Sequence, residues 1–186
     1  VKLGFKLNQM VIIPSCINAS DFKYHLRDLS KNKELNILTV ASLVEVKGLK
    51  YAIEAISLFE MKFLNIDLTY KIVGEGPLLD SLSSCIQALN LKKSVNLVGF
   101  LNQTDVRHLL ESADIFILPS ITTDSGNCEA QGLVIQEAQA SGIPVIASNS
   151  GGIPDSITHL NNGVLVDEKK PQAIADAIEF LLCHEE

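Results

Sequence analysis

The stretch "CEAQGLVIQEAQASGIPVIAS" (residues 128–148) decides the fold of this chain. Its middle part, 132–142, carries apolar residues at helical spacing and ends in a glycine, which is typical of a helix C-terminus. The part that follows, 144–148, is short and almost continuously apolar, as expected of a strand that is buried on both faces of a parallel sheet. A helix followed at once by a buried strand predicts an α/β domain.

The same alternation of strand and helix extends in both directions along the chain. Short apolar segments predict strands at 10–15, 35–42, 67–74, 94–100, 114–120, 144–148 and 163–167. Amphipathic segments predict helices at 49–61, 77–91 (opened by Pro77), 103–113, 132–142, near 153–160, and at 171–182. This order predicts a doubly wound, Rossmann-like parallel sheet with helices on both faces. In such a sheet, ligands bind beyond the carboxyl ends of the strands.

Length, composition and charge narrow the class of protein. A chain of 186 residues suffices for one α/β domain with a full core, and 47% hydrophobic with 20% charged residues is typical of a globular chain. The net charge of −7 argues against a nucleic-acid partner or an anionic membrane surface. No apolar run approaches the roughly 20 residues that cross a bilayer, and four scattered cysteines favour reduced thiols over a disulfide framework.

Three candidate sites directly follow predicted strands. Lys47 and Gly48 lie where a helix begins, so an ammonium and free N–H groups could bind an anion there, although a plain surface lysine fits the pattern too. The two glycines of "VGEGPL" (73–78) lack the third glycine of a dinucleotide fingerprint, so an ordinary tight turn is the better interpretation. At 99–105, main-chain groups could meet a flat ring, but this signal alone is very weak.

The fourth candidate site is the start of the predicted helix 132–142. N–H groups near Gly132 and Leu133 form an anion site, with Glu129 just before it and Glu137 one and a half turns inside the helix. Two acids that flank a phosphate site suit a ligand with hydroxyls on both sides, and a sugar nucleotide is such a ligand. The alternative is that Glu129 only complements the helix dipole and that Glu137 is solvated.

These residues together resemble the retaining GT-B glycosyltransferases, specifically glycosyltransferase family 4. "EAQGLVIQEAQASGIPVIAS" (129–148), followed by "GGIPD" (151–155), is similar to the E-x7-E region of that family. Other segments resemble further family motifs: "VIIPSCINASDF" (11–22), "LTVASLVEVKG" (38–48), "KIVGEGPLLDSL" (71–82) and "VNLVGFLNQTDVRHLLESADIFILPS" (95–120). The long loop before Glu129 resembles the exopolysaccharide (colanic-acid-type) branch. The resemblance covers nearly the whole chain.

The resemblance implies a role for each matching residue. Glu129 would bind hydroxyls of the donor sugar and Glu137 the ribose, while Lys47 would neutralise the departing diphosphate, so that no metal is required. Glu129 and Lys47 would thus be the catalytic residues. Phe100 and Leu101 would contact the base. The diphosphate would be held by the backbone of Ala130, Gln131, Gly132 and Leu133.

The resemblance also implies a larger enzyme and a reaction. Residues 1–34 would be a linker and first strand from an interdomain junction, and 35–186 the nucleotide-sugar-binding second domain of a GT-B fold. The N-terminal acceptor domain would be absent, which agrees with the lack of an initiator Met. The whole enzyme would be a cytoplasmic hexosyltransferase of surface polysaccharide biosynthesis. It would use a glycan or lipid-linked acceptor and contact the inner face of the membrane only through the absent domain. The fragment alone would be inactive.

Two departures keep other functions open. Ser42 stands where the family has an arginine, and Ala130 and Gln131 replace a Gly-Phe pair, so the floor of the sugar pocket is expected to differ. A non-catalytic nucleotide-binding module therefore remains an alternative. A GT-B sugar-nucleotide epimerase is a second alternative, but such an enzyme would lack the E-x7-E spacing that this chain has. No chemistry is assigned to the histidines at 25, 108, 159 and 184.

Overall fold

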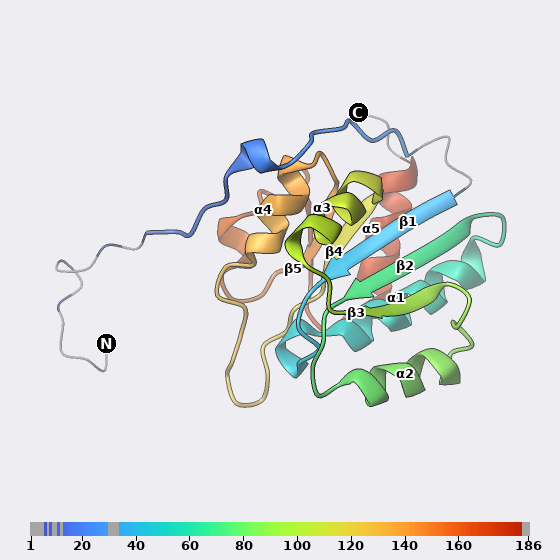
Figure 1. Cartoon of the computed structure of the whole chain (residues 1–186). Helices are drawn as coiled ribbons and strands as arrows, with labels where there is room; N and C mark the ends of the chain where they lie inside the picture. The colour runs from blue at the N-terminus through green and yellow to red at the C-terminus, as the bar shows by residue number, and fades with distance from the viewer. Residues whose placement is uncertain (1–5, 7, 9–10, 12, 30–33, 184–186) are drawn as a thin grey trace.

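A parallel sheet forms the centre of the structure. The computed structural model describes residues 6, 8, 11, 13–29 and 34–183. Its strands are β1 (Glu34–Val40), β2 (Asp67–Val73), β3 (Val95–Gly99), β4 (Ile115–Leu118), β5 (Val145–Ser148) and β6 (Val164–Val166). All neighbours pair in parallel in the order β3-β2-β1-β4-β5-β6 (Figure 1). The order reverses between β1 and β4, which is the switch point of a doubly wound sheet.

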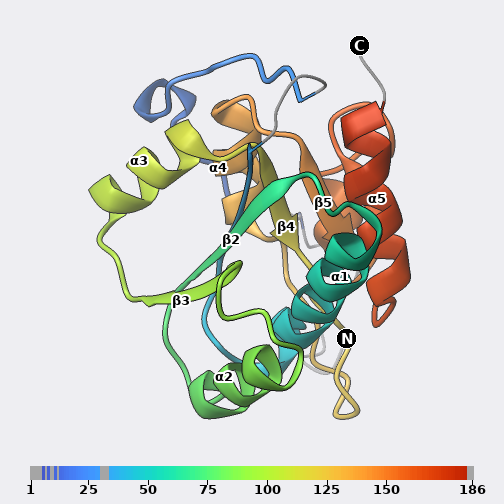
Figure 2. The same cartoon turned by 90° about the vertical axis from the view of Figure 1, so that its right-hand side faces the viewer.

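Helices cover both faces of this sheet. The α-helices are α1 (Leu49–Lys62), α2 (Leu79–Ala88), α3 (Gln103–Ser112), α4 (Leu133–Ala140) and α5 (Pro171–Cys183). Short 3₁₀ turns are η2 (Ala19–Asp21), η3 (Glu45–Lys47) and η4 (Ile153–Asp155). Helices α1, α2 and α5 pack on one face, and α3 and α4 on the other (Figures 1 and 2). The predicted Rossmann-like α/β fold is therefore confirmed. No helix in the described part of the chain is long and apolar enough to cross a membrane.

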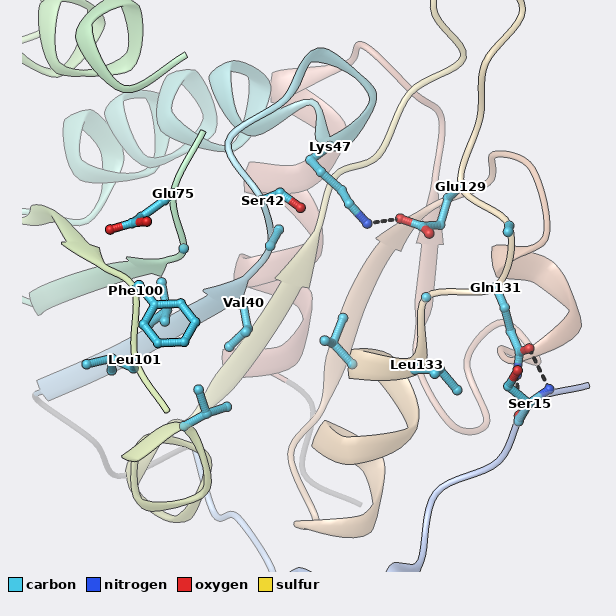
Figure 3. A pocket seen from close by; sticks show the side chains of 17 residues that line it. Ser15, Val40, Ser42, Lys47, Glu75, Phe100, Leu101, Glu129, Gln131 and Leu133 are labelled. Atoms are coloured by element: carbon cyan, nitrogen blue, oxygen red, sulfur yellow. Dashed lines mark hydrogen bonds and ion pairs between the residues drawn. The ribbon is translucent and has the colours of Figure 1, made fainter. Parts of the chain in front are cut away.

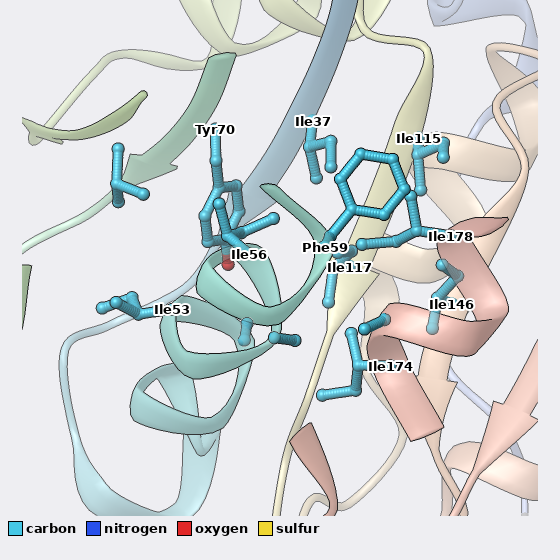
Figure 4. Packing of buried hydrophobic residues seen from close by; sticks show 14 of the residues in the cluster. Ile37, Ile53, Ile56, Phe59, Tyr70, Ile115, Ile117, Ile146, Ile174 and Ile178 are labelled. Carbon is cyan, nitrogen blue, oxygen red and sulfur yellow. The ribbon is translucent and has the colours of Figure 1, made fainter. Parts of the chain in front are cut away.

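The burial of the strands explains the short apolar runs in the sequence. Every residue of β4 and β5 is buried, so these strands carry apolar side chains on both faces. Phe59 of α1 and Ile178 of α5 pack with the same face of the sheet (Figure 4). The hydroxyl of the buried Tyr70 has a hydrogen-bond partner, the Thr39 hydroxyl at 2.8 Å. Burial is the main cause that raises the pKa of Tyr70 above its ordinary value.

The strand predicted at 10–15 is wrong for the residues that the structure describes. Residues 11 and 13–15 lie outside any strand, and residues 10 and 12 are outside the described part. Val11 and Ile13 are 85% and 84% exposed, so their β-branched side chains pack against no sheet. The helix predicted near 153–160 is only the short turn η4, and Pro77 precedes α2 by two residues instead of opening it.

The predicted linker is bound to the domain through Arg27. Its guanidinium donates hydrogen bonds to the carbonyl oxygens of Leu110, Glu111 and Ala113, at 3.1, 3.0 and 2.9 Å. These carbonyls end helix α3, where an arginine satisfies groups that have no partner within the helix. The part of the segment around Arg27 therefore lies near the amino ends of the central strands, opposite the edge where ligands are expected.

Candidate functional site

A cavity of about 660 Å³ opens at the carboxyl edge of the sheet, beside the switch point between β1 and β4 (Figure 3). Its walls come from segments that follow four of the strands and from one residue of the linker. The lining residues are Ser15, Val40, Ala41, Ser42, Lys47, Val73, Gly74, Glu75, Phe100, Leu101, Val106, Glu129, Ala130, Gln131, Gly132, Leu133 and Val134. This is the position where doubly wound sheets bind ligands.

The turn between β1 and α1 directs Lys47 into this cavity. Gly48 ends η3 with φ +60, a left-handed conformation that favours glycine. A Cβ at Gly48 would lie 2.0 Å from the Pro119 carbonyl oxygen, so only glycine allows this close approach. The Ile121 N–H also donates to the Val46 carbonyl at 2.8 Å. The turn is thus tied to the loop that carries Glu129.

Lys47 and Glu129 form an ion pair inside the cavity. The Lys47 ammonium donates to Glu129 Oε2, and their side chains are only 18% and 13% exposed. The Ser120 hydroxyl lies 3.4 Å from the same carboxylate oxygen. The sequence predicted that both residues face the ligand, and the structure also brings them together with each other. An anionic ligand that binds Lys47 must therefore compete with Glu129 for the ammonium.

Helix α4 presents its N-terminus to the same cavity. Its N-cap is Gly132, with φ +72 and no side-chain capping bond, and Leu133 is the first helical residue. No side chain caps the N–H groups of the first turn, and only that of Ile135 donates to the Gly132 carbonyl, at 2.9 Å, among the described bonds. The first turn carries the positive end of the helix dipole. Lys47 lines the same cavity, so an ammonium and a helix N-terminus, which both favour anions, face one space.

Two adjacent glycines hold the Glu129 loop in place. The Gly152 N–H donates to the Glu129 carbonyl oxygen at 2.9 Å. A Cβ at Gly152 would lie 1.9 Å from the Ala130 carbonyl oxygen, and one at Gly151 would lie 2.1 Å from that of Glu129. The motif "GGIPD" (151–155) therefore has a physical function: it lets the next loop pack directly against the backbone at 129 and 130.

A second anchor of this loop has no signal in the sequence. Glu168, which follows β6, accepts a hydrogen bond from the Thr122 N–H. The Ser150 hydroxyl lies 3.4 Å from the same Glu168 oxygen and 3.3 Å from the Thr122 hydroxyl. Because these residues lie 18 and 46 positions from Glu168, neither spacing nor periodicity predicts that they meet.

Among the residues to which the resemblance gives a role, Glu137 alone does not line the cavity. Its side chain is partly buried, and burial raises the pKa of its carboxyl above the ordinary value, while the charge of Arg107 on α3 acts in the opposite direction. The Arg107 guanidinium also pairs with Asp21 at 3.3 Å and lies 5.5 Å from the Phe22 ring. The role of Glu137 toward a ribose stays a prediction.

The opposite end of the cavity has an apolar surface that the sequence predicted only weakly. The ring of Phe100 is 70% exposed, and Leu101 lies beside it (Figure 3). Glu75 faces this end and was not predicted as a site residue. Its neighbours Gly74 and Gly76 pack against the turn after β1, since a Cβ there would lie 2.1 and 2.5 Å from carbonyl oxygens. These glycines form the tight turn that was expected.

The remaining predictions concern substituted positions and histidines. Ser42 lines the cavity, so Lys47 is the only lysine or arginine side chain in the described lining. The Gln131 side chain points away from the ion pair and bonds to Ser15, so it does not form a floor beside Glu129 (Figure 3). None of the described histidines lines the cavity.

Comparison with protein families and with known proteins gives a consistent result. Residues 21–186 match the family model described as "Glycosyl transferases group 1". The chain is 36% identical over 175 residues to the amylovoran biosynthesis glycosyltransferase AmsK of Erwinia amylovora, covering 94% of this chain and 42% of that protein. It is 37% identical over 141 residues to WcaL of Salmonella typhimurium, a putative colanic acid biosynthesis glycosyltransferase, covering 76% of this chain and 34% of that one. The chain thus spans about two fifths or less of these relatives.

A solved structure shows the same fold. A variant of TarM from S. aureus, crystallised with fondaparinux, alpha-GlcNAc-glycerol and UDP, superposes with a TM-score of 0.77 at 25% identity. The match covers 96% of this chain and 34% of TarM. The Rossmann-like domain described above is therefore the kind that forms one half of a GT-B fold.

Proposed function

The chain belongs to the group 1 glycosyltransferases, and from this premise we propose that it is the donor-binding half of a retaining transferase. It binds a nucleoside-diphosphate sugar in the cavity at the carboxyl edge of the sheet. The observation that carries the proposal is the convergence there of Lys47, Glu129 and the uncapped N-terminus of α4. A single ammonium and a helix N-terminus suit a diphosphate, and a partly buried carboxylate beside them suits sugar hydroxyls.

The two chemically different ends of the cavity agree with a ligand that has two different ends. In the proposal, the base lies against Phe100 and Leu101, and the diphosphate lies at residues 130–133 with Lys47 as its counter-charge. Glu129 then holds the donor sugar and Glu137 the ribose. Because Lys47 and the helix N-terminus supply the positive field, the proposed site needs no metal ion. The UDP in the TarM complex supports a nucleotide ligand for this fold.

The rest of the proposed reaction depends on the longer relatives. The names of AmsK and WcaL support a place in polysaccharide biosynthesis. We further propose that a hexose moves to a glycan or lipid-linked acceptor of a surface polysaccharide, in the cytoplasm or at the inner face of the membrane. In this proposal a further domain binds the acceptor. The 186-residue chain therefore binds nucleotide but transfers sugar slowly or not at all.

A thermal-shift panel tests the proposed function. UDP, GDP and ADP, their sugar conjugates and the matching monophosphates would each be added to the chain. We expect one base to raise the unfolding temperature, and the diphosphate to act at a lower concentration than the monophosphate, because the anion site accounts for much of the binding. If no nucleotide shifts the unfolding temperature, the donor-binding proposal is overturned.

The variant Glu137→Gln tests the role of Glu137 by two measurements, the pH dependence of stability and the affinity for nucleotide. Burial raises the pKa of Glu137 above its ordinary value of 4.5, so the ionised carboxylate destabilises the folded chain. Relative to wild type, the variant should gain stability as pH rises from about 4.5 through the raised pKa, and then level off. The gain should stay below about 1 kcal/mol, because the group is only half-buried and solvent screens it.

Urea unfolding of wild type and Glu137→Gln between pH 4 and pH 8 measures this difference. Nucleotide titration at pH 7.5 should show weaker binding by the variant in spite of its higher stability, since an amide is a poorer acceptor for ribose hydroxyls. A variant that binds nucleotide as wild type does would remove Glu137 from the proposed site. Glu54→Gln, on α1 outside the cavity, is the control for loss of a carboxylate.

A further inference from the structure

Gln131 lies at the rim of the cavity and bonds to a residue 116 positions earlier in the chain (Figure 3). The Ser15 N–H donates to Gln131 Oε1 at 2.9 Å, and Gln131 Nε2 donates to the Ser15 carbonyl oxygen at 2.6 Å. One side-chain amide thus satisfies both backbone polar groups of Ser15, as a neighbouring strand residue would. We name this pair of hydrogen bonds between Gln131 and Ser15 the clasp.

The clasp is the main polar attachment of the segment 13–17. Within the described part of the chain, these residues make no other hydrogen bond or ion pair. Residues 13–16 are exposed, so apolar packing contributes little to their position. Ser15 nevertheless lines the donor cavity. The position of this part of the cavity wall therefore depends on the side chain of Gln131.

Through the clasp, Gln131 connects the proposed diphosphate site to the segment 13–17. The backbone of Gln131 belongs to the stretch from Ala130 to Leu133 that lines the cavity and is proposed to hold the diphosphate, while its side chain holds Ser15. A ligand that fixes the backbone at 130–133 also fixes the point from which the Gln131 side chain extends. By linkage, ordering of the segment 13–17 then favours the bound ligand by the same factor.

We propose that Gln131 is a positioning residue that couples occupancy of the donor cavity to the order of the segment 13–17. The proposal rests on the donor-binding function stated above. It explains why a neutral amide suits position 131: a carboxylate would place an oxygen against the Ser15 carbonyl and add negative charge beside the diphosphate. The segment is then held more firmly in the cavity wall when the donor is bound.

Amide hydrogen exchange of the ¹⁵N-labelled chain tests the coupling at Ser15. UDP and GDP are the probes, and wild type is compared with Gln131→Leu, which removes both hydrogen bonds at similar volume. Gln87→Leu, on the exposed face of α2, is the matched control. In the ligand-free chain, Gln131→Leu should speed Ser15 exchange about tenfold, as expected for the loss of two solvent-exposed hydrogen bonds.

The nucleotide that binds should slow Ser15 exchange in wild type and in the control, and leave it unchanged in Gln131→Leu. By reciprocity, the Kd of that nucleotide should rise about three- to tenfold in Gln131→Leu, and Gln131→Glu should weaken binding further. Nucleotide binding without any effect on Ser15 exchange in wild type, or equal Kd values in wild type and Gln131→Leu, would overturn the coupling alone. If neither UDP nor GDP perturbs residues 130–133 of wild type, the donor-binding function fails, and the coupling fails with it.

Discussion

The variant Lys47→Met is expected to weaken binding of the nucleoside diphosphate about 100-fold, which corresponds to roughly 2.7 kcal/mol. Lys47 is the only lysine or arginine side chain among the described residues of the cavity lining. Methionine keeps most of the apolar stem of lysine and removes the charge. The helix N-terminus of α4 alone then holds the diphosphate, and its partial charge is about half a unit. Isothermal titration with the nucleotide that the thermal-shift panel identifies measures the loss.

The same variant also loses stability, and this effect must be separated from binding. Glu129 is 13% exposed and would keep a negative charge without its partner, at a cost of about 2–3 kcal/mol. The double variant Lys47→Met with Glu129→Gln removes that charge and should recover most of the stability without recovering nucleotide affinity. If affinity returns together with stability, Lys47 is a structural residue and not a phosphate ligand.

Lys50→Met is the matched control for this pair of variants. Lys50 lies three residues further along, and its ammonium is 3.6 Å from the carboxylate of Glu54. Its side chain is 65% exposed, so the pair lies in solvent and contributes little. Both stability and nucleotide affinity should stay close to wild type. A large loss of affinity in this control would show that net charge, and not the position of Lys47, governs binding.

The sheet could be predicted from the sequence because its strands are short and largely apolar, and two of them, β4 and β5, are buried on both faces. The strand β4 is a continuous apolar run and β5 is apolar up to its last residue, Ser148, and this follows directly from helices packed on either side. The same reasoning failed at residues 11 and 13, where β-branched side chains are exposed and pair with nothing. Composition indicates the tendency to form a strand, but pairing requires a distant neighbour that no local pattern contains.

The candidate site was predictable in its location more than in its contacts. Lys47 and Glu129 each follow a strand, and the carboxyl ends of parallel strands share one edge, so their proximity follows from topology. Their direct ion pair depends on side-chain directions across 82 residues, which spacing cannot give. Glu168 and the bond between Gln131 and Ser15 were missed for the same reason. Each joins segments that come together only when the loops are folded.

The variant Gly152→Ala is expected to lower the free energy of unfolding by about 3 kcal/mol and to weaken nucleotide binding at least about tenfold. Gly152 has φ −92, which any residue adopts, so the effect is purely steric. The added Cβ would lie 1.9 Å from the Ala130 carbonyl oxygen. A backbone atom cannot move aside by changing rotamer, so the loop that carries Glu129 has to shift as a whole.

The shift would act on the site through two connections. The hydrogen bond from the Gly152 N–H to the Glu129 carbonyl would lengthen, and the Glu129 carboxylate would move relative to Lys47. The control is Gly126→Ala in the same loop, where a Cβ meets nothing within 4 Å and only the left-handed φ of +82 opposes alanine. It should cost about 1 kcal/mol and leave nucleotide affinity unchanged. Urea unfolding measures the stability of both variants, and nucleotide titration measures their affinity. Equal affinities for Gly152→Ala and Gly126→Ala would mean that packing of the 151–152 backbone against residues 129 and 130 does not position the ligand site.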